Sequence, residues 1–224
     1  MKRIVFSVLA AMALAPSGAV ALGATDPLPM LDMSPEGIAD ANREAAAIIA
    51  AAKAEDVFDV VPLRGIAGII LRHKASGFVC DFERHQARNA VVVYPNPVRG
   101  DEVSCSTMTL IGTRTTIISR DSRTDDVAIA KAARSIQGSN PRAVPAPEPR
   151  IQHWSAGSGG LPSPKRVRFL IDDRLEEVIL GHVDGWLVED WFIAPRDLAE
   201  SDTIDSHWYQ TAATVRAKSA APPR

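Results

Sequence analysis

Residues 185–193, GWLVEDWFI, make up the most hydrophobic strand-like segment in the second half of the chain. Side chains alternate between the two faces of a β-strand, so Leu187 and Trp191 share one face of this segment. Val188 and Phe192 share the opposite face. Apolar residues on both faces predict a central strand of a sheet that is covered on both sides.

The segments before this strand are short, rich in β-branched residues and separated by turns, which predicts an antiparallel meander. They cover residues 57–61, 66–73, 78–82, 90–94, 103–108 and 110–119. Two further strand-like segments, residues 166–171 and 177–180, precede the central strand, with the turn Asp172-Asp173-Arg174 between them. The second half of the chain therefore predicts a C-terminal hairpin.

Three segments have the apolar spacing of amphipathic helices. Ser34 suits the start of the first helix, which should end near residues 53–55. Thr124 suits the start of the second, which runs to about Ile136, where Gly138 favours a stop. The expected apolar faces are Ile38, Ala41, Ala45, Ile48, Ile49 and Ala52 in the first helix, Val127, Ala130, Ala133 and Ile136 in the second, and Ile204, Trp208, Ala212 and Val215 in the third, within residues 198–217.

This element order predicts an α+β fold, with an antiparallel β-sheet (a meander plus a C-terminal hairpin) packed with about three helices. Over residues 57–217 the order resembles the PsbP-like fold of extrinsic photosystem proteins and some bacterial envelope proteins. The segments FVCDF, residues 78–82, and EVSC, residues 102–105, resemble those of uncharacterised secreted bacterial proteins. The second resemblance implies export and assigns no activity.

The first 21 residues have the three-part pattern of a secretory signal peptide. Lys2 and Arg3 precede an apolar run over residues 4–15, and small residues lead up to an expected cleavage after Ala21, with Ala24 as the alternative. The competing interpretation is a membrane anchor. The apolar run is too short for one, since a spanning helix needs about 20 residues.

The remaining chain is expected to hold one domain. Residues 22–33 are a leader, residues 34–217 form a single α+β domain, and residues 218–224 are a tail. A Pro/Gly-rich loop over residues 138–164 interrupts this domain. The segment after that loop is small for an independent domain, which favours one domain over two.

The composition indicates a globular protein, because 46% of the 224 residues are hydrophobic and 23% are charged. The 25 basic and 27 acidic residues nearly balance, which argues against a nucleic-acid partner. No stretch after the signal segment reaches the length of a membrane span, so we expect no integral membrane segment after cleavage. The expected partner is a protein or a small ligand.

Cys80 and Cys105 are the two cysteines of the chain, and both lie in strand-like segments. An exported protein experiences an oxidising compartment, so we expect these residues to form a structural disulfide. Two buried free thiols and a redox pair are the alternatives. The redox pair is disfavoured because the chain has no Cys-x-x-Cys motif.

The familiar catalytic motifs are missing from the sequence. Residues 156–160, AGSGG, resemble the Gly-Asp-Ser-Gly-Gly around the nucleophile of trypsin-like proteases, but Gly157 replaces the aspartate. The segment lies in the Pro/Gly-rich loop, which favours a flexible linker. The acidic residues of 172–177 are expected to be hydrated turn carboxylates. There is no His-Glu-x-x-His or phosphate-binding loop, and we predict no catalytic residue, metal or cofactor.

Three residues are candidates for binding. His182 and Asp184 could present two ligands on one strand face, because strand side chains repeat every two residues. Gly residues on both sides favour the alternative of a turn histidine beside an Asx-type turn. Trp154 lies in the Pro/Gly-rich loop, where an exposed tryptophan can anchor a partner. The other three tryptophans are expected to fill the core.

These observations predict an exported soluble protein, periplasmic or secreted, that is a non-enzymatic binding or envelope-structural module. An exported hydrolase with a dispersed site is the alternative, since a catalytic triad needs no local motif. A small-ligand carrier, with a pocket between the sheet and the terminal helix, is a third.

Overall fold

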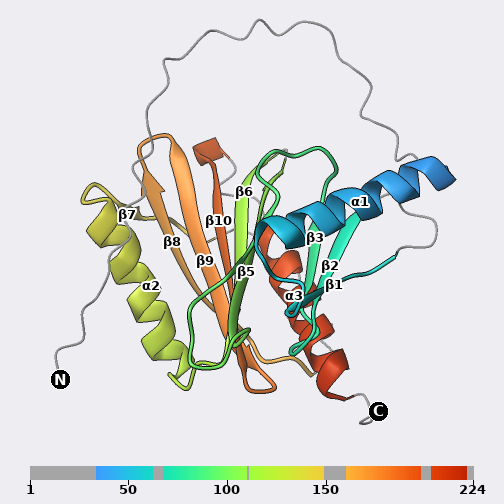
Figure 1. Ribbon diagram of the computed structural model, residues 1–224. Helices are drawn as coiled ribbons and strands as arrows, with labels where there is room; N and C mark the ends of the chain where they lie inside the picture. The colour runs from blue at the N-terminus through green and yellow to red at the C-terminus, as the bar shows by residue number, and fades with distance from the viewer. Residues whose placement is uncertain (1–33, 63–67, 110, 149–159, 198–202, 221–224) are drawn as a thin grey trace, which may run out of the picture. The chain divides into compact units, whose positions relative to one another are not determined.

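The computed structural model describes residues 34–62, 68–109, 111–148, 160–197 and 203–220, with the side chains of 203–206 left undescribed. The described residues belong to one unit of the chain, residues 31–224. Its three helices and antiparallel strands confirm the α+β class (Figure 1).

A seven-stranded antiparallel sheet has the order β4-β5-β6-β10-β9-β8-β7. Its strands are β4 (Ala90–Val93), β5 (Glu102–Thr109), β6 (Gly112–Ser119), β7 (Val144–Pro145), β8 (Lys165–Ile171), β9 (Arg174–Val183) and β10 (Trp186–Pro195). β10 is the central strand, as its two apolar faces predicted. It pairs with β6 over Leu187↔Ser119 to Ile193↔Thr113 and with β9 along its whole length.

The predicted meander is divided between two sheets. β1 (Phe58–Val60), β2 (Ile69–His73) and β3 (Val79–Phe82) form a separate three-stranded sheet in the order β1-β2-β3. The chain then enters the larger sheet at β4, after a seven-residue connection without strand structure, residues 83–89. Alternation alone identifies strands and not their partners, so the sequence did not locate this division.

The disulfide of Cys80 and Cys105 joins the two sheets. Cys80 lies in β3 and Cys105 in β5, their Cα atoms are 5.9 Å apart, and both side chains are buried. No strand pairing connects β3 with β5 in the described sheets. The covalent link therefore supplies a connection that hydrogen bonding between strands does not.

Three helices pack against the sheets (Figure 1). α1 (Pro35–Ala51) contacts β1, β2 and β4, α2 (Asp125–Ser139) contacts β8 and β9, and α3 (Thr203–Ser219) contacts β9 and β10. The predicted caps are confirmed: the Ser34 hydroxyl accepts a hydrogen bond from the Gly37 N–H, and Thr124 caps α2 in the same way.

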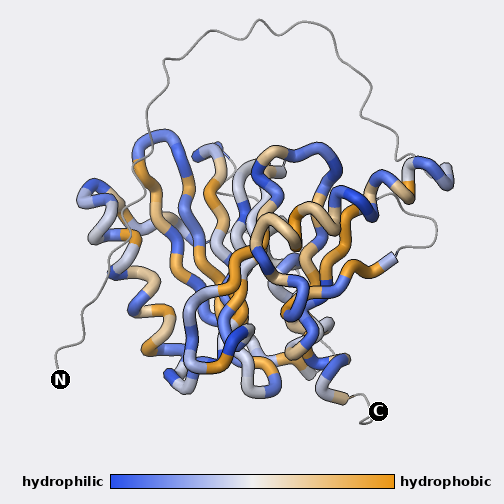
Figure 2. The backbone as a smooth tube through the Cα atoms, viewed as in Figure 1, coloured by the Kyte–Doolittle hydropathy of each residue, from blue (hydrophilic) through white to orange (hydrophobic). Residues whose placement is uncertain are grey.

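α2 and α3 cover opposite faces of the seven-stranded sheet. Ala128, Ala132 and Ile136 of α2 pack with Leu187 of β10 and other residues of its face. Trp208, Ala212 and Val215 of α3 pack with Val188 and Phe192 in the larger core. Figure 2 shows that hydrophobic residues gather along the strands, while the connecting turns are mostly hydrophilic.

The predicted face of α2 is confirmed at Ile136 but is wrong by one position at its start. Val127 is exposed, and the buried series is Ala128, Ala132 and Ile136, with a spacing of four residues. Gly138 does not stop the helix, which continues to Ser139 with Asn140 as its C-cap. The loop expected over residues 138–164 is therefore shorter, and it also contains β7, which pairs with β8.

Candidate functional site

A cleft of about 590 Å³ lies between α2 and the central strands of the seven-stranded sheet. The side chains used below are Ile117, Ser119, Glu189 and Trp191 from the sheet, Ala128, Lys131, Ala132 and Ser135 from α2, and Asp121 and Arg123 from the segment between them. Residues 96–98 and 101–102 line the side of the cleft next to β5. A cavity of this size suits a small molecule.

Strand alternation and small helix residues create the cleft. Glu189 and Trp191 are two residues apart on β10, so both side chains lie on the face that α2 covers. Across the β6–β10 pair, Glu189 stands opposite Ile117. Ala128 and Ala132 present only methyl groups from α2, which leaves space between the helix and the sheet.

Glu189 is a half-buried carboxyl group in this cleft. Its Oε2 atom accepts a hydrogen bond of 3.2 Å from the Trp191 indole N–H. Burial raises the pKa of Glu189 above its usual range, although the Trp191 hydrogen bond and the nearby charges of Arg123 and Lys131 oppose the shift. A carboxyl that loses hydration in a cleft is a candidate for a functional group.

The two cations near Glu189 differ in their partners. The Arg123 guanidinium donates to the Asp121 carboxylate, with 2.6 Å from Nε to Oδ2, and this hydrogen bond lowers the pKa of Asp121. Lys131 is exposed on α2, and no hydrogen bond or ion pair engages its ammonium group within the described residues. Lys131 is therefore a cation of the cleft whose ammonium group has no such internal partner.

His182 does not meet Asp184 in the structure. Its Nδ1 atom bonds to the Asp125 carboxylate at 2.5 Å, and its Nε2 atom bonds to the Asp121 carbonyl oxygen at 2.9 Å. Burial disfavours the charged imidazolium, but these acceptors outweigh it and raise the pKa of His182. His182 thus attaches the segment that carries Asp121, a wall of the cleft, to β9.

Asp184, the second predicted binding residue, is not among the described residues that line this cleft. Asp184 and Gly185 form the β9–β10 turn with positive φ values of 48° and 79°, as a type I′ turn requires. The Asp184 carboxylate lies 4.0 Å from Arg216. Trp154, together with Ser158, lies outside the described residues, so its binding role stays a prediction.

Trp191 is the tryptophan that departs from the expected core. Trp186 and Trp208 are buried in the larger core, as predicted. Trp191 is partly exposed and lines the cleft beside Glu189. Sequence reasoning missed this site because Trp191 was assigned to the core and Glu189 was one charge within an apolar strand. The signal was the Glu-x-Trp spacing, which places both side chains on one face.

A second polar cluster lies on the opposite face of β10. Asp190 is fully buried, its Oδ1 accepts from the Thr116 hydroxyl at 3.0 Å, and its Oδ2 accepts from His207 Nδ1 at 3.0 Å. The Arg114 Nε atom is 3.7 Å from the same oxygen. A carboxylate that holds Nδ1 leaves Nε2 of an imidazole for acid–base work. Among the described residues, no serine, threonine or cysteine side chain hydrogen-bonds His207.

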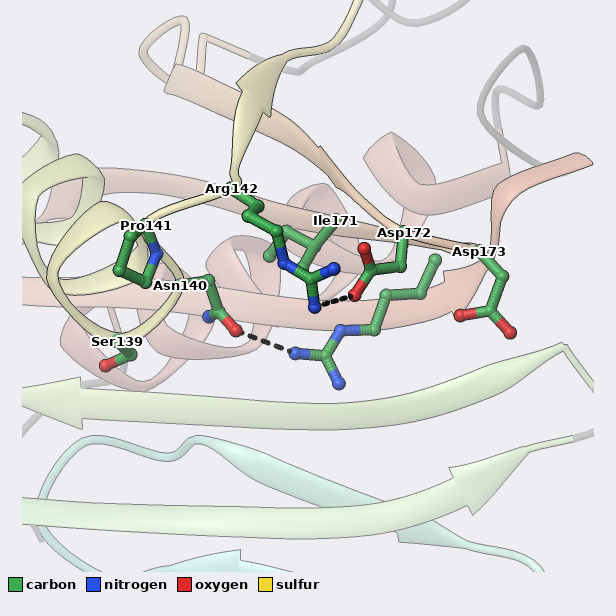
Figure 3. A pocket seen from close by; sticks show the side chains of 8 residues that line it. Ser139, Asn140, Pro141, Arg142, Ile171, Asp172 and Asp173 are labelled. Atoms are coloured by element: carbon green, nitrogen blue, oxygen red, sulfur yellow. Dashed lines mark hydrogen bonds and ion pairs between the residues drawn. The ribbon is translucent and has the colours of Figure 1, made fainter.

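A smaller pocket of about 210 Å³ lies where α2 ends beside the β8–β9 turn (Figure 3). Its polar groups already bond to one another: Arg142 donates to Asp172 at 2.9 Å, and Arg174 donates to the Oδ1 atom of the Asn140 side-chain amide at 3.2 Å. These contacts hold the helix end against the turn. The cleft under α2 is larger and holds a cation without such a partner, so it is the stronger candidate site.

Comparison with protein-family models and with curated proteins finds no match to the chain. Within the described residues, no three His, Cys, Asp or Glu side chains converge in a way that could hold a metal ion. No described helix has the length and apolar character needed to cross a bilayer.

Proposed function

We propose that this chain is a binding protein that holds a small polar molecule in the cleft between α2 and the seven-stranded sheet. The observation that carries the proposal is the half-buried Glu189 carboxyl in a cleft of about 590 Å³. Ligand sites typically combine such a volume with a few polar groups on partly apolar walls. Ile117, Trp191 and Ala128 supply the apolar part of the walls.

The proposed site differs in position from the carrier hypothesis drawn from the sequence. That hypothesis places a pocket between the sheet and the terminal helix, on the side where Trp208, Ala212 and Val215 of α3 pack into the larger core. The cleft that supports the present proposal lies under α2. The binding surface that we propose is therefore the α2 face of β10 and β6.

Blocking the cleft tests the proposed function. Ser135 lines the cleft on α2, whereas Gln137 is exposed two residues later and is not among the lining residues. The Ser135→Trp variant should lose the thermal shift that a bound small molecule gives, because the indole fills the cavity. The Gln137→Trp variant should keep it. Equal ligand responses from both variants, across a library of small polar metabolites, would argue against the cleft.

Export is part of the proposal. The signal pattern of residues 1–21 supports it, and an intramolecular disulfide is compatible with an oxidising compartment. The proposed location is the periplasm or the exterior of the cell, with cleavage after Ala21. Intact mass of the protein recovered from an exported fraction gives the first residue, and recovery of the uncleaved chain in the cytoplasm would contradict export.

General-base catalysis is a second candidate function, and one observation favours it. Buried Asp190 accepts from His207 Nδ1, the contact that orients the imidazole in dispersed hydrolase sites. Turnover of ester or amide substrates that His207→Gln abolishes, in a variant with an unchanged melting temperature, would support this function. Turnover that is equal in this variant would exclude the histidine as the base.

A further inference from the structure

We infer that the ligand of the cleft under α2 is a small zwitterion, with an ammonium group that meets Glu189 and Trp191 and a carboxylate that meets Lys131. This inference rests on the proposed function and names the class of ligand. It follows from three features of the cleft: the pairing on β10, the position of Lys131, and the internal use of the other charges.

The first feature is the combination of a carboxylate and an aromatic ring on one strand face. Glu189 and Trp191 are neighbours on that face, and the indole N–H fixes one carboxylate oxygen at 3.2 Å. No donor reaches the other oxygen, Oε1, within the described residues. An ammonium group is recognised by such a carboxylate together with an aromatic face. A bound cation would also compensate the charge of a carboxylate that burial disfavours.

The second feature is a positive charge on the opposite wall. Lys131 projects from α2, and its charge opposes the rise that burial causes in the pKa of Glu189. The two groups nevertheless form no ion pair within the described residues, so their charges remain separated across the cleft. A ligand with both charges can bridge them. A simple anion would face Glu189 unfavourably, and a simple cation would face Lys131 unfavourably.

The third feature is that several neighbouring charged groups already have contacts within the described residues. Arg123 is held by Asp121, and the Arg120 guanidinium lies 4.1 Å above the Trp186 ring. The Glu102 carboxylate accepts a hydrogen bond from the Asn96 amide. Glu189 and Lys131 are therefore two opposite charges of the cleft that a ligand can satisfy without breaking an internal contact.

Titration calorimetry on the mature, disulfide-containing protein tests this assignment with four probes. Glycine betaine and 4-aminobutyrate carry both charges, choline carries the cation alone, and butyrate carries the anion alone. We expect at least one of the zwitterions to bind at least about tenfold more tightly than choline and butyrate, because each single-charge probe leaves one charged group unmet. Butyrate or choline binding as tightly as the best zwitterion would overturn the inference.

Two variants assign the two ends of the ligand. Glu189→Gln should weaken the zwitterion by about tenfold or more and leave butyrate no weaker, while Lys131→Met should weaken the zwitterion and leave choline no weaker. Thermal melts of both variants show that they are folded. An unchanged zwitterion affinity in Glu189→Gln would overturn the inference.

The inference can fail while the proposed function stands. If none of the four probes binds but another small molecule binds and Ser135→Trp abolishes that binding, the cleft is a ligand site and the zwitterion assignment is wrong. If no molecule of the library responds differently to Ser135→Trp and Gln137→Trp, the proposed function fails and the zwitterion assignment fails with it.

Discussion

Glu189 and Asp190 are adjacent on β10, yet their carboxyl groups lie on opposite faces of the seven-stranded sheet. Glu189 is half-buried in the cleft under α2, and its Oε1 atom accepts no hydrogen bond within the described residues. Asp190 is fully buried on the α3 side, where Thr116 and His207 bond to both of its oxygens. Consecutive positions of one strand thus hold a carboxyl group suited to a ligand and one that supports the fold.

Replacement of Asp190 should be strongly destabilising. Asp190→Ala leaves the Arg114 guanidinium and His207 without the carboxylate that they share, and removal of one partner from a buried charged network costs about 3–5 kcal/mol. Urea denaturation at pH 7 measures this loss as a lower free energy of unfolding. An Asp190→Ala variant as stable as the wild type would contradict the supporting role of this carboxylate.

Glu189→Gln is the matched control, and it should not lower stability at pH 7. The pKa of Glu189 is raised on folding, so its charged form is disfavoured in the folded state. Such a carboxyl contributes stability below its unfolded pKa, and this contribution is lost as the pH rises through its folded pKa. Glutamine is neutral at every pH, so the variant does not lose this stability at pH 7. A free energy of unfolding equal to or above that of the wild type, in the same urea experiment, is the expected result.

His182 should make stability depend on pH. Its pKa is raised above 6.5 on folding, so its contribution is fully present below the unfolded pKa and is lost as the pH rises through the folded pKa. The difference in unfolding free energy between wild type and His182→Gln should therefore be larger at pH 5.5 than at pH 8.5.

His85→Gln is the control for this pH dependence, since the His85 side chain is 76% exposed. It should change stability little at either pH. If the difference in unfolding free energy between wild type and His182→Gln instead grew from pH 5.5 to pH 8.5, Asp125 and Asp121 would not be holding the imidazole in its charged form.

Alternating hydrophobicity was sufficient to locate the strands other than β7 and the central position of β10. It did not reveal that β3 and β4 belong to different sheets, because a strand's apolar face is the same whichever sheet it joins. The residues of the proposed binding site were harder to predict. His182 carries a recognisable functional group, but its imidazole bonds to Asp125 of the same chain. Lys131 and Glu189 line the same cleft only because α2 packs on the sheet.

Helix caps depend on residues that are close in the sequence, whereas the buried face of a helix depends on contacts with other elements. Ser34 and Thr124 act on N–H groups three residues away, so the sequence alone predicts both caps. The face of α2 depends on contacts with β8 and β9 and on the bond between Asp125 and His182. These contacts bury Ala128 and leave Val127 exposed, a distinction that apolar spacing among many alanines could not make.

An alanine at Gly181 should lower stability, because this position lies directly against a buried ring. A Cβ atom at this position would be 3.0 Å from Trp208 Cζ2, in the core between α3 and the sheet. Gly181→Ala forces the packed indole to move, and overpacking of this kind costs about 1–3 kcal/mol. Thermal melts should show the loss as a lower midpoint.

Gly138→Ala is the contrasting variant in the same melts. A Cβ atom there meets nothing within 4 Å, and Gly138 lies inside α2. Alanine should therefore stabilise the helix by about 0.5–1 kcal/mol. If Gly181→Ala and Gly138→Ala shifted the melting midpoint in the same direction, the close packing of Trp208 against β9 would not be what decides the effect of an alanine at position 181.

The Cys80–Cys105 disulfide should contribute about 3–4 kcal/mol, because it closes a loop with a sequence separation of 25 residues and restricts the unfolded chain. Replacing both cysteines with alanine should lower the free energy of unfolding by this amount in urea denaturation. Reductant should destabilise the wild type to a similar extent and leave the double variant unchanged. A wild-type denaturation curve that does not move with reductant, together with two thiols labelled in the denatured unreduced protein, would show that the two sheets are not joined covalently.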